Sequence, residues 1–506
     1  MAGVLPVPMP DTPSSQPLLP RWLAYALLVG VPLLGLVVVL RIGASLPLPD
    51  NSWSAAAARP AAGIADGAIV LRLGSFLAQI VVILLLARLL GLALRRIGQP
   101  AVVGEMLVGI LLGPSVLGSV APQVYAGLFP VGTVRFLAAG SQLGLLLFMF
   151  LAGLELRLDD LRGRGYTAIL TSHASMATPL FLGGALALSL YPHFGVPGGG
   201  FAGFALFLGA AMSVTALPAL TRILTERGLR DSQLGTLALA CAALDDVSAW
   251  CLLAVVISAA RAGSTAALAL TLAGTAAFVA LMVVVVRPRL GSLARRYCAD
   301  GYVNQDILAA VVIIALASAW VTHWLGISAI FGAFLAGVVM PKSGTFVRGV
   351  AQPLESVLLV VLLPLLFATT GIRTSLALGS GAVTWGFLSL VLTVAIAGKL
   401  GASALAARVA GFTWHASFSL GVLMNTRGLM GLVIVQVALD AGVASPPLYA
   451  LMVVMAIVTT AMTTPALSLL ARRRSAVVPA LRGGALATPR APRRVAAPTP
   501  SRHGTK

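Results

Sequence analysis

The sequence predicts an all-α polytopic membrane protein with about fourteen transmembrane helices. Of its 506 residues, 59% are hydrophobic and only 10% are charged, whereas soluble domains carry about 25% charged residues. The apolar residues form continuous runs of about 20 residues, which is the length needed to cross a bilayer as a helix. Outer-membrane barrels show short alternating segments instead, so the pattern excludes that class.

The two ends of the chain differ from its apolar middle. Residues 1–21 are proline-rich and predicted to be disordered, and the basic tail 472–506 is predicted to be disordered, cytoplasmic and in contact with anionic lipid. Residues 22–44 are predicted as an extra transmembrane helix. A cleaved signal peptide is the alternative, because AAAARPAAG follows.

The remaining spans are expected at 69–94, 99–117, 137–156, 167–191, 202–224, 235–259, 265–286, 306–323, 326–341, 353–373, 381–406, 414–440 and 446–471.

The distribution of basic residues sets the orientation. With both termini in the cytoplasm, the outside loops at 118–134, 192–201 and 441–445 contain no Lys or Arg. The basic residues then cluster in the inside loops and the tail, as the positive-inside rule predicts for a bacterial-type inner membrane. The formal charge of +19 therefore reflects membrane topology, and no nucleic-acid partner is expected.

Two adjacent carboxylates, Asp245 and Asp246, lie in the middle of the apolar run 234–260. Each costs about 2.5–3.5 kcal/mol to insert at the centre of a membrane helix. Acidic side chains at this depth usually handle cations or protons. A purely structural ion pair is the alternative interpretation.

Two spans carry residues that interrupt a helix. In the first, 209–224, Ser213, Thr215 and Pro218 fall in mid-span. Proline removes a backbone donor, and the freed carbonyls and the two hydroxyls could coordinate a dehydrated cation. The alternative is an ordinary proline kink with hydroxyls bonded to their own helix.

In the second interrupted span, 419–439, the polar residues are Asn425, Thr426 and Arg427, and Gly428 permits unusual backbone angles. An arginine at membrane depth needs a partner. The alternative is a loop that divides two short helices.

The spacing of the two interrupted spans indicates an inverted repeat. Each is the second member of a triplet of spans, within 167–259 and within 381–471. An odd number of spans separates corresponding helices, which gives the triplets opposite topology and crosses the two broken helices. Lys399, in the first span of the second triplet, is the expected partner of Asp245 or Asp246; a lysine reaching to the interface is the alternative.

Several stretches in order give the chain a family resemblance. They are QPAVVGEMLVGILLGPSVLG (99–118), LFMFLAGLELRLDDLR (147–162), SVTALPALTRIL (213–224), ALDDVSAW (243–250), GISAIFGAFLAGVVMP (326–341), LFATTGIRTSL (366–376) and MNTRGLM (424–430). From about residue 69 to residue 471 the chain resembles the monovalent cation:proton antiporter family 2.

The resemblance implies the sodium/proton antiporter fold for residues 69–471 and a homodimer. It implies a mobile core domain of 167–259 and 381–471, with dimerisation and scaffold helices elsewhere. By position, it makes Asp246 the ion-binding aspartate and Lys399 the partner of the first aspartate. An Asp at 245 is similar to the electrogenic sodium/proton type.

The resemblance also assigns roles to the polar residues of the two interrupted spans. Thr215 and Ser213 match the unwound stretch beside the cation, and Pro218, Asn425, Thr426 and Arg427 are expected to support the broken helices. The chain departs from the family at Gly431, where many members have Glu. It also has no nucleotide-binding regulatory domain of the potassium-efflux type, so gating by glutathione is not expected.

The function expected from these residues is exchange of a monovalent cation, Na⁺ in the first place, for protons by alternating access. Asp246, with Asp245 and Thr215, is expected to hold either the transported cation or a proton, and this competition couples the two fluxes. Transport is electrogenic if Asp245 exchanges Lys399 for a second proton. An electroneutral K⁺/H⁺ antiporter is the alternative.

Functions of other classes fit the sequence less well. An intramembrane aspartyl protease needs carboxylates that face each other, whereas adjacent residues on one helix diverge by about 100°. A passive channel would need no counter-ion. The chain is therefore expected to be a transporter rather than an enzyme, with no cofactor and with membrane lipid around it.

Overall fold

The computed structural model describes residues 17–47, 73–155, 165–196, 200–230, 232–261, 265–291, 305–326, 328–373, 382–427, 431, 434–435, 438–439 and 442–477. Within these ranges the chain is helical, apart from turns and one isolated antiparallel bridge between Gly195 and Ala444. Ten of the described helical stretches are long and apolar enough to cross a membrane. The prediction of an all-α membrane protein is confirmed.

The described helices are α1 (Arg21–Tyr25), α2 (Val31–Gly43), α3 (Leu73–Arg96), α4 (Ala101–Leu112), α5 (Leu117–Val120), α6 (Pro122–Leu128), α7 (Val131–Glu155), α8 (Gly165–Phe194), α9 (Phe201–Ser213), α10 (Leu217–Glu226), α11 (Gln233–Arg261), α12 (Thr265–Ala280), α14 (Gln305–Trp324), α15 (Ala329–Val339), α16 (Gly344–Val357), α17 (Leu363–Arg373), α18 (Ala382–Val409), α19 (Trp414–Met424) and α21 (Pro446–Val477). Three π-helical turns are η1 (Ala26–Gly30), η3 (Leu281–Val286) and η4 (Leu358–Leu362).

The predicted spans coincide with single helices, with a helix continued through a π-helical turn, or with pairs of half-helices. Thus 202–224 divides into α9 and α10, and 353–373 lies in the continuous helix α16–η4–α17. The range 414–440 is helical to Met424 and is only partly described beyond Arg427. Hydropathy locates these segments because a helix in lipid must satisfy its backbone groups internally and present apolar side chains outward.

The structure differs from the prediction at both ends. Residues 17–20 were expected to be disordered, but Leu18 donates its N–H to the carbonyl of Val409 at 3.0 Å, one of the terminal carbonyls of α18 that lack an intrahelical donor. At the other end α21 continues through the basic residues to Val477. The predictions for residues 1–16 and 478–506 lie outside the described residues.

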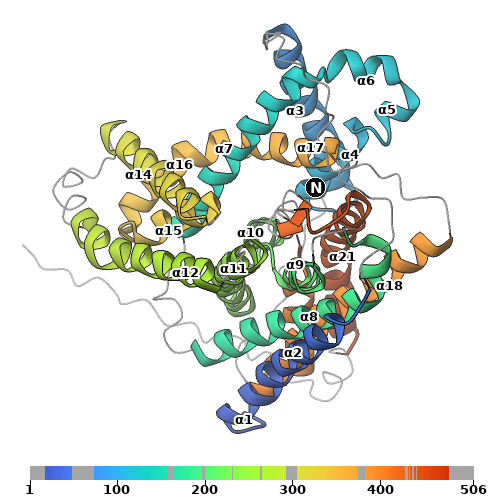
Figure 1. Ribbon diagram of the computed structural model, residues 1–506, viewed down its shortest axis with the longest axis vertical. Coiled ribbons are helices and arrows are strands. Elements are labelled where there is room, and N and C mark those ends of the chain that lie inside the picture. Colours follow the sequence, from blue (N-terminus) through green and yellow to red (C-terminus); the bar gives the residue numbers. More distant parts are fainter. Residues whose placement is uncertain are drawn as a thin grey trace, which may run out of the picture.

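Most helices fall into two groups, which Figure 1 shows in different parts of the molecule. The core bundle comprises α8–α11, α18, α19 and α21, and the scaffold bundle comprises α3, α4, α7 and α14–α17. The core bundle contains the two predicted triplets of spans. Whether it moves against the scaffold bundle, and whether the scaffold dimerises, stay predictions.

Among the described residues, helices within each bundle approach closely at glycines. A Cβ on Gly183 of α8 would lie 2.7 Å from the Cα of Gly209 in α9, inside the core bundle. A Cβ on Gly153 of α7 would lie 2.2 Å from the carbonyl oxygen of Phe334 in α15, inside the scaffold. Small residues let membrane helices approach to backbone contact, so each bundle is tightly packed.

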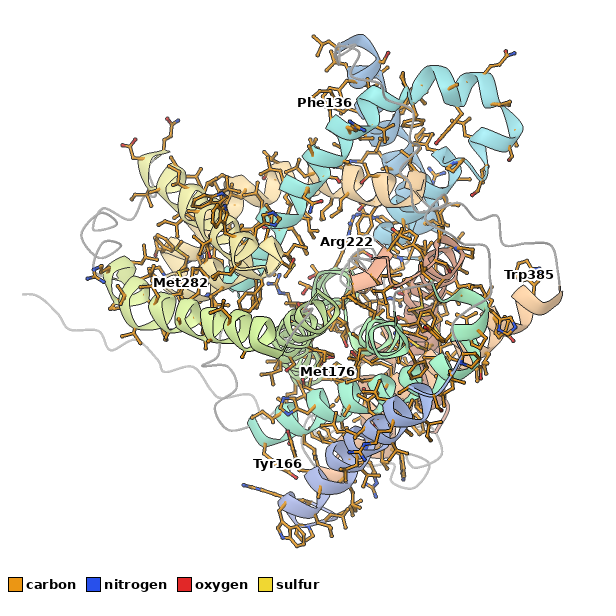
Figure 2. The ribbon with its side chains drawn as sticks, in the orientation of Figure 1. Phe136, Tyr166, Met176, Arg222, Met282 and Trp385 are labelled. Atoms are coloured by element: carbon orange, nitrogen blue, oxygen red, sulfur yellow. The ribbon has the colours of Figure 1, made fainter. Side chains whose placement is uncertain are left out.

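The outer surface is apolar, as expected for contact with lipid. Trp385 projects outward from the end of α18 and is 61% exposed, whereas Met176 and Arg222 lie among the helices (Figure 2). Exposed side chains of this size would be unfavourable in water but match the hydrocarbon of a bilayer.

The extra N-terminal helix packs on the core bundle, along α8 at the lower edge of Figure 1. The hydroxyl of Tyr25 lies 2.7 Å from Nδ1 of His173, and Tyr166 donates its hydroxyl to the carbonyl of Arg21 at 3.0 Å. A Cβ on Gly35 would lie 2.6 Å from the ring of Phe181. These contacts attach the first span to the triplet that contains the candidate site.

Candidate cation and proton site

The first broken helix is interrupted directly beside the two carboxylates. Helix α9 ends at Ser213, residues Val214 and Ala216 adopt extended backbone angles, and α10 begins at Leu217. Pro218 is the second residue of α10, where a missing N–H costs nothing because the first turn has no intrahelical acceptor for it. The break predicted from sequence is present, and it lies before the proline rather than at it.

The second broken helix meets the first at its own interruption. Helix α19 ends at Met424, the residues Asn425–Arg427 are not helical, and Gly431, the next described residue, is helical again. Ala216 donates its N–H to the carbonyl of Thr426 at 3.0 Å, and the Thr215 hydroxyl lies 3.0 Å from the carbonyl of Met424. The two broken helices therefore touch through the backbone groups that the breaks free, as the inverted repeat requires.

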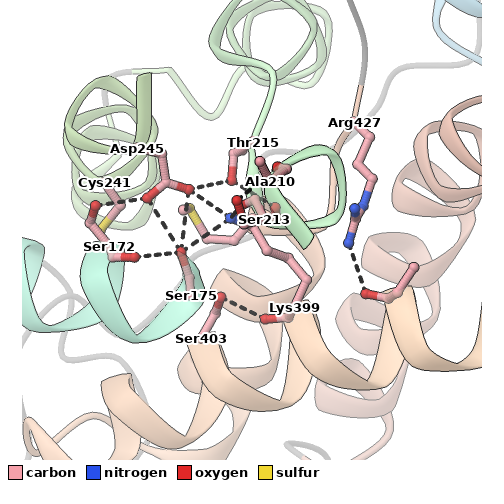
Figure 3. A network of polar contacts seen from close by, with 12 residues as sticks. Ser172, Ser175, Ala210, Ser213, Thr215, Cys241, Asp245, Lys399, Ser403 and Arg427 are labelled. Carbon is pink, nitrogen blue, oxygen red and sulfur yellow. Dashed lines mark hydrogen bonds and ion pairs between the residues drawn. The ribbon is translucent and has the colours of Figure 1, made fainter. Parts of the chain in front are cut away.

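Asp245 lies at this contact and is surrounded by donors. Its Oδ1 accepts a hydrogen bond from Ser172 at 2.7 Å, and its Oδ2 accepts from Thr215 and from Nζ of Lys399, each at 2.7 Å (Figure 3). Asp245 and Lys399 are both fully buried. The four residues come from α8, the first break, α11 and α18, so helices distant in sequence converge on one carboxylate.

Lys399 has three acceptors and does not reach the membrane interface. Besides Asp245, its Nζ donates to the hydroxyl of Ser175 at 3.2 Å and to the carbonyl of Ser213. The alternative that Lys399 extends to the interface is therefore wrong, and the predicted pairing with the first aspartate is present.

Asp246 has the opposite environment although it is the next residue. It is 1% exposed, and neither carboxylate oxygen has a hydrogen-bond partner in the described part of the chain. The two side chains diverge because successive helical residues are rotated by about 100°. An ionised carboxylate buried without a partner is strongly unfavourable.

Ser213 contributes its carbonyl rather than its hydroxyl. The hydroxyl donates to the carbonyl of Ala210 in its own helix at 2.8 Å, while the Ser213 carbonyl accepts from Lys399. Of the two polar side chains predicted in the first break, Thr215 alone hydrogen-bonds Asp245. This is the behaviour expected of a helical serine, which commonly bonds the preceding turn.

Arg427 is buried, and its partners are carbonyl oxygens. Its NH1 donates to Ala211 near the end of α9 at 3.3 Å, and its NH2 donates to Ala395 of α18 at 2.9 Å. The last carbonyls of a helix lack intrahelical donors and carry partial negative charge. Arg427 and Lys399 therefore both cap the carboxyl end of the half-helix α9, and Figure 3 shows them on either side of it.

Asn425 and Thr426 join the second break to α21 rather than to Asp245. The Thr426 hydroxyl lies 3.3 Å from that of Thr463, and the Asn425 amide nitrogen lies 3.6 Å from the sulfur of Met462. The hydroxyl of Thr460 donates to the carbonyl of Arg427. These contacts hold the break in place and agree with the supporting role expected for it.

Ser172 and Ser175 are the site residues that the sequence did not identify. They lie three residues apart on one face of α8, inside the segment SHAS. A pair of serines at i and i+3 within an apolar span was the available signal. It is a weak signal, because such hydroxyls usually bond to their own helix.

Glu105, a buried carboxylate of α4, lies outside the cluster. Its Oε1 pairs with Arg222 of α10 at 3.1 Å, and Arg222 also lies 3.6 Å from Glu226. Glu226 in turn lies 3.7 Å from Arg95. These charges join α4 and α3 of the scaffold to the half-helix α10 of the core.

Comparison with known proteins agrees with the all-helical membrane fold. The family model described as "Sodium/hydrogen exchanger, transmembrane" matches residues 81–473. The solved structure of the sodium proton antiporter MjNhaP1 from Methanocaldococcus jannaschii covers 81% of this chain and 99% of its own, with a TM-score of 0.58 and 13% identity. That similarity concerns the fold.

Similar sequences carry related descriptions. The Na(+)/H(+) antiporter NhaS4 of Synechocystis sp. is 42% identical over 390 residues, which are 77% of this chain and 95% of the relative. Cation/H(+) antiporter 17 of Arabidopsis thaliana is 38% identical over 76% of this chain, and K(+)/H(+) antiporter 1 of Saccharomyces cerevisiae is 30% identical over 77% of it. The matched regions are 47% and 46% of those two longer proteins. On the family match, the relatives and the fold, the chain belongs to the sodium/hydrogen exchanger family of integral membrane transport proteins.

Proposed function

We propose that the protein exchanges a monovalent cation, Na⁺ in the first place, for protons across the membrane by alternating access. The single observation that carries the proposal is the pair of adjacent carboxylates at the crossing of two broken helices. Asp245 is saturated with donors, whereas Asp246 has no hydrogen-bond partner among the described residues. The named activities of the cyanobacterial and plant relatives support the same function.

Competition at Asp246 couples the two fluxes. A proton neutralises the carboxylate by forming a bond, and Na⁺ neutralises it by coordination, so the two exclude each other on the same oxygens. An empty, ionised site is expensive to move through the apolar barrier. A loaded site is cheaper, so the core bundle changes its access only with a proton or a cation bound, as alternating access requires.

The Asp245–Lys399 pair supplies a second proton step. When the cation binds, oxygens of Asp245 and Thr215 complete its coordination with Asp246, and Lys399 must release Asp245. If Asp245 binds a proton in the returning half of the cycle, two protons move for each cation and transport is electrogenic.

The remaining assignments complete the proposal. The protein lies in a bacterial-type inner membrane with both termini in the cytoplasm, it forms a homodimer through the scaffold bundle, and the core bundle moves. The lack of Lys and Arg at 118–134, 192–201 and 441–445, three of the predicted outside loops, supports the orientation. The separate packing of the two bundles supports the motion.

The test is transport by the purified full chain in proteoliposomes that contain a pH-sensitive dye and have an acidic interior. Adding Na⁺ outside should make the interior alkaline, and adding choline should not. A membrane potential that favours the net charge movement should accelerate exchange relative to a potential clamped at zero. Failure of Na⁺ and of K⁺ to move protons, or proton flux without any exchanged cation, overturns the proposal.

A second candidate is electroneutral K⁺/H⁺ exchange, which the 30% identity to the yeast K(+)/H(+) antiporter favours. The same assay separates the two candidates. Proton movement with K⁺ but not Na⁺, at rates independent of voltage, selects the second.

A further inference from the structure

An apolar groove opens on the outer surface of the core bundle, between the half-helix α19 and the helix α21 that packs against it. Its volume is about 270 Å³, and it is lined by five apolar residues: Phe418, Val422, Ala466, Leu469 and Leu470. Leu469 is 62% exposed and Phe418 is 42% exposed. Because the bilayer core contains no water, hydrocarbon must fill this groove when the protein is in its membrane.

The groove begins one helical turn from an aromatic residue at the end of α19. Trp414 is the first residue of this helix and is 52% exposed, and exposed tryptophans concentrate at membrane–water interfaces. Phe418 follows Trp414 by four residues and Val422 follows it by eight, which correspond to about 6 and 12 Å along the helix. The groove therefore lies within the hydrocarbon of one leaflet, which is about 15 Å thick.

A positive charge is fixed at the interface end of the groove. The guanidinium carbon of Arg408 lies 5.5 Å from the centroid of the Trp414 ring, and this ring stacks on Phe418 with centroids 5.7 Å apart. Arg408 also donates from NH1 to the carbonyl of Phe412 at 2.8 Å. The aromatic pair thus leads from the guanidinium into the groove.

The helices that form the groove carry no carboxylate to compensate this charge. Residues 400–424 and 446–477 contain no Asp or Glu, and Arg408 makes no ion pair within the described part of the chain. Beyond Leu470, α21 continues through the sequence Arg472, Arg473 and Arg474. The groove therefore combines an apolar body with a basic end.

We propose that this groove is a binding site for an anionic phospholipid, with one acyl chain along Phe418 and Leu469 and the phosphate at Arg408. A guanidinium matches the geometry of phosphate oxygens, and basic pockets between membrane helices bind anionic headgroups. The bound lipid contacts α19, the half-helix that ends at the second break. The site is separate from Asp245 and Asp246, and its occupancy does not depend on which cation is exchanged.

Charge distinguishes this lipid from other occupants of the groove. The chain beyond Val477 contains basic residues and no acidic ones, so the basic end of the groove would repel it. A second copy docked through the same face by twofold symmetry would bring like charges together. A zwitterionic lipid fills the groove equally well but offers no net negative charge to Arg408.

The test measures lipid binding to the purified full chain in detergent by native mass spectrometry. Phosphatidylglycerol and phosphatidylcholine with the same acyl chains are compared, and phosphatidylglycerol should bind more tightly. One basic residue near a headgroup changes lipid affinity by about fivefold. Arg408→Gln should therefore weaken phosphatidylglycerol binding by about fivefold and leave phosphatidylcholine binding unchanged, whereas Arg408→Lys keeps the charge and should retain most of the affinity.

A second variant tests the groove without changing any charge. Ala466→Phe places a ring in the groove and should remove one tightly bound phosphatidylglycerol per chain. Val458→Phe is the matched control, because it adds the same ring to the same helix at a position that is 38% exposed and outside the groove. Arg348→Gln removes an exposed arginine from the scaffold helix α16. Both controls should bind phosphatidylglycerol as the wild type does.

Three results would overturn the proposal. The first is equal affinity of the wild type for the two lipids, and the second is equal weakening by Arg408→Gln and Arg348→Gln, which would reflect general surface charge. The third is displacement of the lipid by an equal concentration of glycerol phosphate, which would make a free phosphate the ligand. If Ala466→Phe fails to fold, the Arg408 variants decide the outcome. Transport enters none of these measurements, so the exchange function stands or falls separately.

Discussion

At the scale of single residues, the site gives two identical side chains, Asp245 and Asp246, different surroundings. Asp245 has three donors at 2.7 Å, and Asp246 has no hydrogen-bond partner among the described residues. The separation follows from helix geometry, since neighbouring residues face different helices. One carboxylate is thereby held in a hydrogen-bond network, and the other has no such network among the described residues.

Asp246→Asn should abolish cation/proton exchange while the protein stays folded. The amide has almost the size of the carboxylate but carries no charge and takes no proton near neutral pH, so it cannot alternate between the two substrates. Dye-reported exchange in proteoliposomes measures the loss, and a monodisperse elution profile with an unchanged melting temperature checks the fold. Exchange at the wild-type rate in this variant would show that the assignment of Asp246 is wrong.

Lys399→Met should lower the free energy of unfolding by about 3–5 kcal/mol, the cost of leaving one member of a buried ion pair without its partner. Adding Asp245→Asn to that variant should recover most of the loss, because the unpaired charge is then gone. Thermal unfolding in detergent measures both changes. A double variant as unstable as Lys399→Met alone would mean that lysine packing, rather than the charge pair, accounts for the loss.

At the scale of elements, the half-helices depend on partners that an uninterrupted helix does not need. The carboxyl end of α9 is capped by Lys399 from α18 and by Arg427 from the second break. Its carbonyls would otherwise be buried without donors, at about 1–3 kcal/mol each. The two broken helices are therefore stable only together, and the arginine belongs to the structure of the first break as much as to the second.

Arg427→Gln should destabilise the protein by about 2–4 kcal/mol, because the shorter amide cannot reach the carbonyls of both Ala211 and Ala395. Arg348→Gln is the control, since this exposed arginine bonds only to its own helix at Gly344 among the contacts described. Melting temperatures of the two variants in the same detergent should differ by several degrees. Equal melting temperatures would contradict the capping role.

The ion pairs around Arg222 cross from one bundle to the other. Glu105 of α4 is 7% exposed and pairs with Arg222 of α10, which follows Pro218 by four residues, just beyond the first break. A displacement of the core bundle against the scaffold would have to separate this pair or carry it along. The ion pair therefore opposes a displacement of α10 relative to α4.

At the scale of the whole molecule, the sequence predicts the positions of the helices better than the contacts of the site. Spans follow from hydropathy because lipid enforces long apolar helices. The crossed breaks follow from Pro218 and from Asn425–Arg427 in equivalent spans. The pairing of Lys399 follows because a buried lysine needs an acceptor and few carboxylates are available at that depth.

Other features were beyond sequence reasoning for physical reasons. The roles of Ser172 and Ser175 depend on which face of α8 meets α11, and periodicity is weak in a helix that is apolar on all sides. Ser213 contributes a carbonyl, which every residue possesses, so its side chain gave a misleading signal. The partners of Arg427 are backbone carbonyls, which every residue has. Which carbonyls lie near Arg427 depends on tertiary packing and could not be read from the sequence.

At the scale of the whole molecule, the first span also links movement of the core bundle to the surrounding lipid. The stretch Arg21–Gly43 has 23 residues, about 35 Å of helix, and it is fixed to α8 through Tyr25, Tyr166 and the packing of Gly35. Its outer face meets the acyl chains, with Trp22 and Leu34 about 70% exposed. If the core bundle shifts along the bilayer normal, this helix must slide with it past the surrounding lipids, so bilayer thickness and fluidity enter the free-energy barrier of each turnover.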